Sequence, residues 1–197
     1  VVLGAGVVGT TAAQIAVGMG ADVTVIARSG DTLRRIDAQF DGRVRTVFST
    51  AEAVEHWCRR ADLLVGAVLV PGAAAPKLVS AQTIKAMKRG AVLVDVAIDQ
   101  GGCAETSKPT THDNPIYIVD GVVHYCVANM PGAVARSSTI ALTSVTLPYG
   151  LAIANQGLKT AAHTSDALKR GINTFDGKCV HPGVAKSCGL PYAEYAA

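Results

Sequence analysis

Residues 1–9 read VVLGAGVVG, an apolar run that leads into glycines at positions 4, 6 and 9. This Gly-x-Gly-x-x-Gly spacing between a strand pattern and a small-residue helix pattern is the fingerprint of a dinucleotide-binding βαβ unit. The glycines of such a turn allow the backbone to approach a pyrophosphate at the helix N-terminus. We therefore predict that Gly4, Gly6 and Gly9 form a nucleotide-binding turn. A tight turn without a ligand is the alternative.

Strand and helix patterns alternate through the first two-thirds of the chain. Strands are expected at residues 1–3, 22–26, 44–48, 63–68 and 91–98, with two further strand-like runs at 116–119 and 122–127. The intervening helices are expected at about 7–19, from a cap at Asp31 to 40, after Ser49 or Thr50, and near 81–88. This order predicts an α/β fold, a Rossmann-type doubly wound parallel sheet with its ligand outside the carboxyl ends of the strands.

The pattern changes after residues 129–131. Two helices are expected at about 138–156 and 157–170, followed by an irregular tail over 171–197. We therefore divide the chain into a dinucleotide-binding domain, 1–135, and a helical part of a second domain, 136–197, which is too short for an independent core. Because the chain has no initiator Met and begins within its first strand, we expect it to be a fragment.

The composition argues against several classes of protein. The chain has 49% hydrophobic and 17% charged residues, a net charge of +3 and no long basic run, so nucleic acid is not an expected partner. No continuous apolar run is long enough for a membrane span. The five cysteines lack metal-binding spacing, which indicates reduced thiols, no metal site and a cytoplasmic location.

The end of the second expected strand lacks the acid that usually holds the ribose 2′-hydroxyl of NAD. Ala27 occupies that position and is followed by Arg28 and Ser29. A cation and a hydroxyl can bind a 2′-phosphate, which predicts acceptance of NADP. The alternative is that Arg28 points to solvent, which leaves relaxed selectivity or weak NAD binding. Thr32 does not supply the further positive charge that a phosphate would favour.

Polar residues also follow two other expected strands. Asp99 lies in VDVAIDQGGC (94–103) at the sheet rim, while Asp95 lies within the strand, and Asn129 ends the strand in HYCVANMPGAV (124–134). The rim is where ligands of this fold bind. Each of these side chains could instead serve only as a turn residue.

Five separated stretches together resemble the NAD(P)-binding half of alanine dehydrogenase, in the alanine dehydrogenase and pyridine nucleotide transhydrogenase family. They are GAGVVG, GAVLVPGAAAPKLV, AIDQGGC, KPTTHD (108–113) and YCVANMPGAV, and the resemblance covers essentially the whole chain. It implies reversible oxidative deamination of L-alanine to pyruvate and ammonium, with hydride transfer to NAD or NADP. It also implies a homo-oligomer, usually a hexamer.

The resemblance also implies roles for individual residues. Asp99 matches the active-site aspartate, and Lys108 stands where the family usually has Arg, which keeps the charge but loses the bidentate fork. Further cofactor contacts are implied at Val7, Ser49, Val68, Leu69, Val96, Ala97, Ile98, Val127, Ala128, Asn129 and Met130. The substrate-binding Lys and the acid/base His of the family have no counterpart here.

Two other functions remain open at this point. A chain without the substrate Lys and His could act as a non-catalytic nucleotide-binding module. The second alternative is a transhydrogenase-like subunit that passes hydride between nucleotides. Reduction of the cofactor that depends on alanine would distinguish an amino-acid dehydrogenase from such a subunit.

Overall fold

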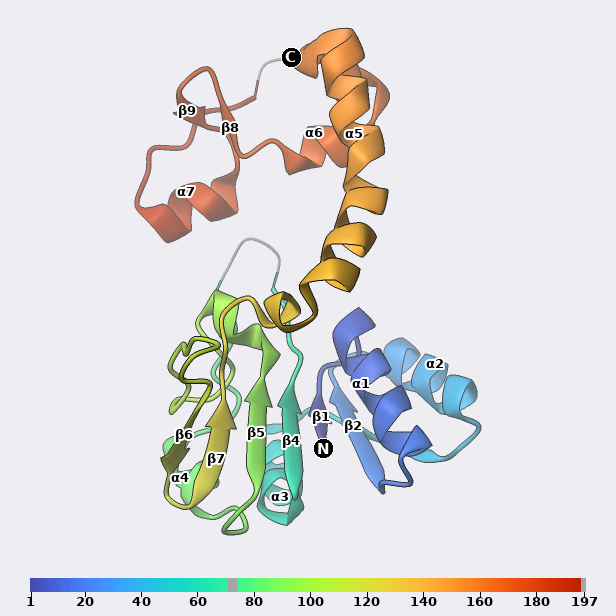
Figure 1. Cartoon of the computed structure of the whole chain (residues 1–197), viewed down its shortest axis with the longest axis vertical. Coiled ribbons are helices and arrows are strands. Elements are labelled where there is room, and N and C mark those ends of the chain that lie inside the picture. The colour runs from blue at the N-terminus through green and yellow to red at the C-terminus, as the bar shows by residue number, and fades with distance from the viewer. Residues whose placement is uncertain (71–73, 196–197) are drawn as a thin grey trace. The chain divides into compact units, whose positions relative to one another are not determined.

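The computed structural model describes residues 1–70 and 74–195 (Figure 1). Two compact units can be distinguished. The first contains Val1–Val70 and Ala74–Met130, and the second contains the chain from Pro131. The first unit ends at Met130, and the domain boundary expected after residue 135 stays a prediction.

The first unit contains a seven-stranded sheet in the order β3-β2-β1-β4-β5-β7-β6. Its strands are β1 (Val2–Leu3), β2 (Val23–Ala27), β3 (Val44–Phe48), β4 (Leu63–Gly66), β5 (Val92–Asp95), β6 (Ile116–Val119) and β7 (Val122–Tyr125). All neighbours are parallel except β6 and β7, so six strands end at the same edge of the sheet (Figure 1). The predicted Rossmann-type fold is confirmed, with an antiparallel edge strand.

Helices cover both faces of this sheet. The core on one face joins Val2 to α1 (Val7–Gly18) and α2 (Gly30–Phe40). The core on the other face joins Leu3 to α3 (Ala51–Arg60) and α4 (Ala81–Lys85). Because successive residues of a strand point to opposite faces, the adjacent Val2 and Leu3 enter different cores. Burial on both faces explains the continuous apolar character of these strands.

Local hydrogen bonds shift several expected boundaries. The strand expected over 91–98 ends at Asp95, because the Asp95 carboxylate accepts a hydrogen bond from the backbone N–H of Ala97 and starts the 3₁₀ helix η1 (Val96–Gln100). The expected cap at Asp31 is wrong, since Ser29 caps α2 and Asp31 lies in its first turn. Thr50, one of the two expected caps, caps α3.

The second unit begins with η2 (Met130–Val134) and the long helix α5 (Ala135–Thr164), followed by α6 (Asp166–Gly171). The expected break between two helices occurs at Gly157, where φ is 75° and ψ is 158°. The tail is not irregular, because it forms the hairpin of β8 (Thr174–Phe175) and β9 (Lys178–Cys179) and the helix α7 (Pro182–Cys188). Ala162, Ile172 and Val180 form a small core there.

The helical segment Met130–Thr164 meets the length and composition criteria of a membrane span, with a mean hydropathy of 1.2. The expectation from the sequence concerned continuous apolar runs, whereas this criterion averages hydropathy over a window of the helix. Ser and Thr side chains interrupt the apolar run, and several of them donate hydrogen bonds to carbonyls of the preceding turn. The average hydropathy is therefore high although the continuous apolar runs are short. A single such helix is weak evidence for a membrane segment.

Candidate functional site

Two of the three turn glycines are required by the fold itself. Gly4 has φ +100°, and a Cβ atom there would lie 2.5 Å from the carbonyl oxygen of Ala67. A Cβ atom at Gly9 would lie 2.0 Å from the carbonyl oxygen of Gly4, because α1 packs directly on the turn. Both positions are thus closed to any side chain, which explains the first and last glycine of the motif.

Gly6 is different. Its φ is −75°, an ordinary value for any residue, and a Cβ atom there would meet none of the described residues beyond its chain neighbours within 4 Å. The residue is exposed at the N-terminus of α1, where the backbone N–H groups have no partner within the helix. None of the residues that the structure describes requires glycine at this position. A ligand that approaches the backbone closely would demand it, as the pyrophosphate of a dinucleotide does.

The end of β2 presents a cation and a hydroxyl beside this turn. Ala27 is buried, whereas Arg28 is exposed and forms no hydrogen bond or ion pair with the part of the chain that the structure describes. The hydroxyl oxygen of Ser29 accepts a hydrogen bond from the backbone N–H of Thr32 at 3.3 Å, which leaves its proton available for a ligand. Arg28 and Ser29 can therefore both face an anion here.

A third polar group at this end was not predicted from the sequence. Arg35 of α2 donates a hydrogen bond from Nη2 to the carbonyl oxygen of Ala5, within the glycine turn, at 2.9 Å. It fixes the turn and adds positive charge beside it. No sequence signal separates Arg35 from Arg34, which instead pairs with Asp31, because the contact of Arg35 joins residues that are 30 positions apart in the chain.

The loops that follow β3 and β4 lie next to the same turn. Ser49 donates its backbone N–H to the carbonyl oxygen of Ala27 at 3.0 Å, and Ala67 donates to the carbonyl oxygen of Leu3 at 2.8 Å. Val68 is half-buried and Leu69 is exposed. The predicted contacts at 27–29, 49 and 68–69 thus surround one edge of the sheet.

The two acids after β5 have opposite environments. Asp95 is fully buried. Its carboxylate accepts hydrogen bonds from three backbone N–H groups and one hydroxyl: Ala97 (3.1 Å), Cys103 (2.8 Å), Ala104 (3.4 Å) and Ser107 Oγ (2.5 Å). Asp99, on η1, is exposed and has no side-chain partner among the described residues. Asp99 is therefore free to meet a ligand, whereas Asp95 holds the turn in place. Val96 is half-buried, and Ala97 and Ile98 are buried.

Asn129 is held in a conformation that few residues adopt. Its φ is 58°, in the left-handed region that Asn tolerates better than most residues. His112, which has no predicted role, lies with Nε2 3.0 Å from the Asn129 carbonyl oxygen. Val127 is buried, Ala128 donates its backbone N–H to the carbonyl oxygen of Thr110 at 3.1 Å, and Met130 is half-buried. The KPTTHD loop and the segment 127–130 therefore pack together.

A polar cluster fastens the loop that carries Lys108. The Tyr117 hydroxyl accepts a hydrogen bond from the Lys108 backbone N–H at 2.7 Å and donates to the carbonyl oxygen of Thr106 at 2.9 Å. His124 stacks on Tyr117, and its Nε2 lies 2.8 Å from the Thr106 hydroxyl. Burial raises the pKa of Tyr117 and lowers the pKa of His124. Both side chains thus remain neutral near pH 7, while the Lys108 side chain is exposed.

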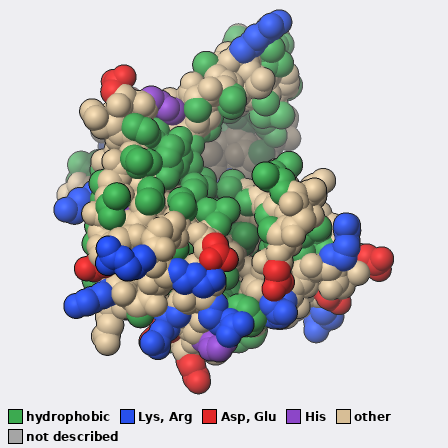
Figure 2. Space-filling view, turned by 60° about the horizontal axis from the view of Figure 1, so that its bottom comes forward, with side chains coloured by type: hydrophobic (Ala, Val, Ile, Leu, Met, Phe, Trp, Pro, Cys, Tyr) green, Lys and Arg blue, Asp and Glu red, His purple; other side chains and the backbone are tan. Residues whose placement is uncertain are grey.

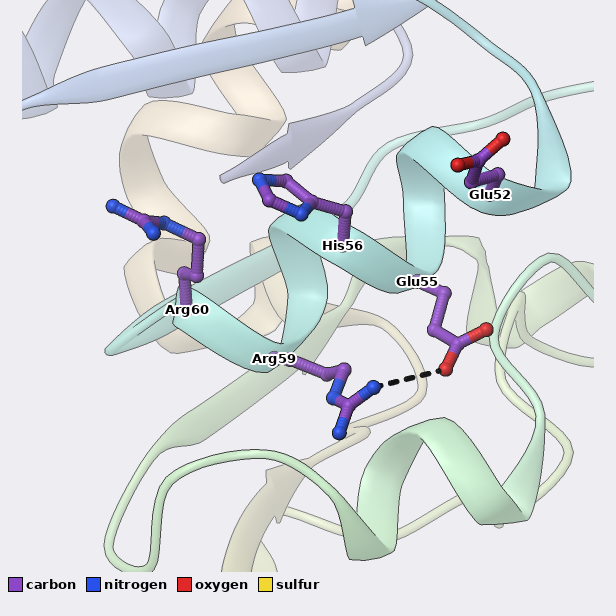
Figure 3. Close-up of a pocket in the computed structure, with 5 residues that line it drawn as sticks. All are labelled: Glu52, Glu55, His56, Arg59 and Arg60. Atoms are coloured by element: carbon purple, nitrogen blue, oxygen red, sulfur yellow. Dashed lines mark hydrogen bonds and ion pairs between the residues drawn. The ribbon is translucent and has the colours of Figure 1, made fainter.

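A separate hollow of about 400 Å³ lies on the outer face of α3 (Figure 3). It is lined by Glu52, Glu55, His56, Arg59 and Arg60, and Arg59 pairs with Glu55 at 3.4 Å. None of the residues expected to bind a nucleotide lines it. Within residues 1–70 and 74–195, no cluster of three or more His, Cys, Asp or Glu side chains could hold a metal ion.

Residues 1–182 match the family described as alanine dehydrogenase/PNT, C-terminal domain. The chain belongs to this family. It is 57% identical to an alanine dehydrogenase of Halomonas elongata, over 99% of this chain and 53% of that relative. It is 53% identical to the alanine dehydrogenase of Mycolicibacterium smegmatis, over 100% of this chain and 53% of that relative. The chain thus spans about half the length of the curated relatives it matches.

Solved structures agree with this assignment. An L-alanine dehydrogenase superposes with a TM-score of 0.84 at 49% identity, over 95% of this chain and 52% of that one. A transhydrogenase from Sinorhizobium meliloti superposes with a TM-score of 0.66 at 27% identity, over 92% of this chain and 48% of that one. The alanine dehydrogenase is thus the more similar of these two structures in both sequence and fold.

Proposed function

We propose that this chain is the nucleotide-binding part of an alanine dehydrogenase, which converts L-alanine and water to pyruvate and ammonium and transfers a hydride to NAD or NADP, reversibly. The glycine at position 6 carries the proposal. The described residues leave room there for a side chain, and glycine leaves the backbone N–H groups of the α1 N-terminus open to a pyrophosphate. The high identity to alanine dehydrogenases supports the choice of substrate.

The residues present fit the cofactor. Gly4, Gly6, Val7 and Gly9 would hold its pyrophosphate, and further residues would contact the rest of it: Ser49, Val68, Leu69, Val96, Ala97, Ile98, Lys108, Val127, Ala128, Asn129 and Met130. When bound, the nicotinamide supplies the hydride acceptor for oxidation of alanine and the donor for the reverse reaction.

Asp99 is the proposed catalytic residue of this chain. Its carboxylate is exposed on η1 and can stabilise ammonium, or the positive charge that develops on the substrate nitrogen. It can also orient the water or ammonia that attacks the imine carbon. The substrate-binding Lys and the acid/base His of the family would be supplied from outside this chain.

We further propose that the site accepts NADP. Ala27 can neither hold the ribose hydroxyls nor repel a 2′-phosphate, and Arg28 has no partner among the described residues that would keep it from a phosphate. Arg35 adds positive charge at the neighbouring turn. These observations favour a phosphate at this end of the site over a free ribose hydroxyl.

Calorimetric titration of NADH and NADPH against this chain tests both proposals, with Arg28→Ala and Ala27→Asp measured in parallel. Binding of either nucleotide supports the site, and absence of binding contradicts it. NADPH binding that Arg28→Ala weakens by about tenfold or more, as expected for loss of a charge-assisted bond, supports the phosphate contact. NADH preference unchanged by Arg28→Ala would refute that contact.

The exposed apolar surface of the second unit supports our proposals on the rest of the protein. Ile140, Leu142, Val145, Leu147 and Leu151 of α5 are each more than half exposed, and a helix that is apolar all round is normally buried. Hydrophobic side chains also lie open on the face drawn in Figure 2. We propose that residues 136–197 belong to a substrate domain and that copies of the protein assemble as a homo-oligomer, by family resemblance a hexamer. On the separate grounds of composition and cysteine spacing, we propose that the protein is cytoplasmic, without a nucleic acid or membrane partner.

Transhydrogenase-like hydride transfer between nucleotides is the second candidate, because a transhydrogenase shares the fold at 27% identity. Reduction of NAD or NADP that depends on alanine, in a protein that also carries the substrate domain, would exclude it. Hydride exchange between two nucleotides without alanine would support it. Nucleotide binding with neither activity would indicate a non-catalytic binding module.

A further inference from the structure

Hydrogen bonds join described parts of the loop after β4, Val70 and residues 74–79, to the loop after β5. Four backbone hydrogen bonds connect residues 74–79 to residues 100–105: Ala75 N–H to Gln100 O (2.8 Å), Leu78 N–H and Val79 N–H to Cys103 O (2.8 and 3.1 Å), and Glu105 N–H to Val79 O (2.9 Å). One of these loops begins with the proposed nucleotide contacts Val68 and Leu69. The other carries Asp99.

Gln100 adds a bridge at the point nearest to both sites. Its side-chain Nε2 donates to the Val70 carbonyl oxygen at 3.2 Å, and its Oε1 accepts from the Val70 backbone N–H at 3.4 Å. The side-chain amide of the half-buried Gln100 therefore both donates to and accepts from the backbone of Val70, as a residue of a paired strand would. It directly follows Asp99, while Val70 directly follows Leu69.

Lys77 adds a charged bridge further along. Its ammonium donates to the carbonyl oxygens of Gly101 at 2.5 Å and Ala104 at 3.0 Å. Gly101 caps the C-terminus of η1, where carbonyl groups lack partners within the helix. A Lys side chain is well suited to such carbonyls. The ammonium thus holds the end of the turn that presents Asp99.

The Asp99 side chain forms no hydrogen bond or ion pair with the described residues, so its position depends on how this turn is held. Asp95 fixes the turn from the sheet side, and Gln100 and Lys77 fix it to the loop after β4. We infer that Gln100 and Lys77 are positioning residues that make the two loops respond as one, so that a nucleotide at Val68 and Leu69 orders the turn bearing Asp99. This inference rests on the proposed nucleotide site.

Hydrogen exchange with ADP as the probe tests the inference on this chain. ADP carries the adenosine and both phosphates of the cofactor but lacks the nicotinamide, so it can occupy the adenosine side near Val68 and Leu69 without reaching Asp99. In the unsubstituted chain, we expect ADP to slow amide exchange in residues 67–70 and also in 97–104, the latter by about fivefold, comparable to the net effect of one hydrogen bond.

Substitutions identify the residues that transmit the effect. In Gln100→Met and Lys77→Met, ADP should still protect residues 67–70 but no longer 97–104. Lys77→Arg, which keeps donors for two carbonyls, should restore the response. Gln82→Met and Lys85→Met are matched controls, because both side chains are exposed on α4 without a side-chain hydrogen bond in the described structure. A merely structural role would raise exchange in the free chain without removing the ADP-induced difference.

The outcomes separate this inference from the proposed function. No ADP-induced protection at 67–70 in any variant would contradict the nucleotide site itself. Protection at 67–70 without protection at 97–104 in the unsubstituted chain would overturn the coupling alone. Equal protection of 97–104 in the unsubstituted chain and in both Met variants would show that other contacts transmit the effect, and would overturn the roles of Gln100 and Lys77.

Discussion

At the scale of single residues, identical amino acids in one motif perform different tasks. Gly4 and Gly9 are required because neighbouring backbone occupies the space of a side chain, whereas Gly6 borders open space. Asp95 and Asp99 are four positions apart, yet one is saturated with hydrogen bonds and the other has none from its side chain in the described residues. The motifs indicated where these residues lie. Only the packing distinguishes residues that serve the fold from residues that serve a ligand.

Substitution of Gly6 by Ala should separate stability from binding. We expect the free energy of unfolding to change by less than about 1 kcal/mol, since only the helix N-cap is altered, while binding of NADH or NADPH falls by at least about tenfold. Gly9→Ala, in contrast, should destabilise the chain by about 1–3 kcal/mol or more through overpacking. Chemical denaturation and calorimetry measure the two effects. Unchanged nucleotide affinity in Gly6→Ala would contradict the role of this turn.

The two acids offer a second comparison. Asp95→Asn places an NH₂ group against hydrogen-bond donors in a buried site, and should lower the free energy of unfolding by about 1–3 kcal/mol. Asp99→Asn should change stability by less than about 0.5 kcal/mol, because surface substitutions of this kind rarely do more. It should nevertheless remove alanine-dependent cofactor reduction in a protein that also has the substrate domain. Equal destabilisation by both variants would contradict the environments described here.

At the scale of elements, the sequence patterns predicted the existence of strands and helices better than their ends. The β5 strand is shorter than its apolar run because Asp95 turns its carboxylate onto the next backbone N–H and starts η1. Ser29, rather than Asp31, caps α2. The β8–β9 hairpin was missed because its strands are only two residues each. In each case a side chain or a very short pairing decides the boundary, and hydrophobic periodicity carries no information about it.

The loop that carries Lys108 should loosen at low pH. Burial lowers the pKa of His124 below its usual value of about 6.5, so the unfolded chain binds a proton more readily than the folded chain. The stabilising contribution of neutral His124 is therefore complete above about pH 6.5 and decreases as the pH falls towards the lowered pKa. We expect the free energy of unfolding to decrease over this range.

Denaturation curves at pH 7.5, 6.5 and 5.5 measure this effect. In His124→Gln the part of the pH dependence that His124 supplies should disappear, although the variant is less stable at every pH. His163→Gln, at an exposed position, is the control and should keep the dependence of the unsubstituted chain. An unchanged pH profile in His124→Gln would show that another group is responsible.

At the scale of the whole molecule, the sequence predicted the sheet and the rim that carries the candidate site. The alternation of strands and helices was sufficient, because parallel strands joined by helices have few possible arrangements. It did not predict that Arg35 reaches the glycine turn or that His112 contacts Asn129, since both contacts join elements that are distant in the chain. It also gave no indication of the exposed apolar surface of α5, which depends on what packs around the helix.

Thiol labelling reports on the integrity of both units at once. Cys58, Cys103, Cys126 and Cys179 are buried and Cys188 is exposed. Burial raises the pKa of Cys58 to about 12 and also raises the pKa of Cys103, which suppresses the reactive thiolates. The native chain should therefore react rapidly with iodoacetamide at one thiol, and Cys188→Ser should lack this phase. More than one rapid thiol in the native chain would show that one of the cores is open.

The position of β1 in the middle of the sheet has a consequence for the order of folding. Val2 pairs with Val25 on one side and with Val65 on the other, so the two partners come from very different distances along the chain. Closing the longer loop costs only about 1 kcal/mol more in entropy, but it delays the step, because distant contacts form slowly. The half-sheet β3-β2-β1 can therefore form before β4 arrives, and until then the glycine turn lacks the neighbouring Ala67 backbone that limits its shape. We therefore expect the proposed nucleotide-binding turn to take its native shape only after β4 has paired with β1.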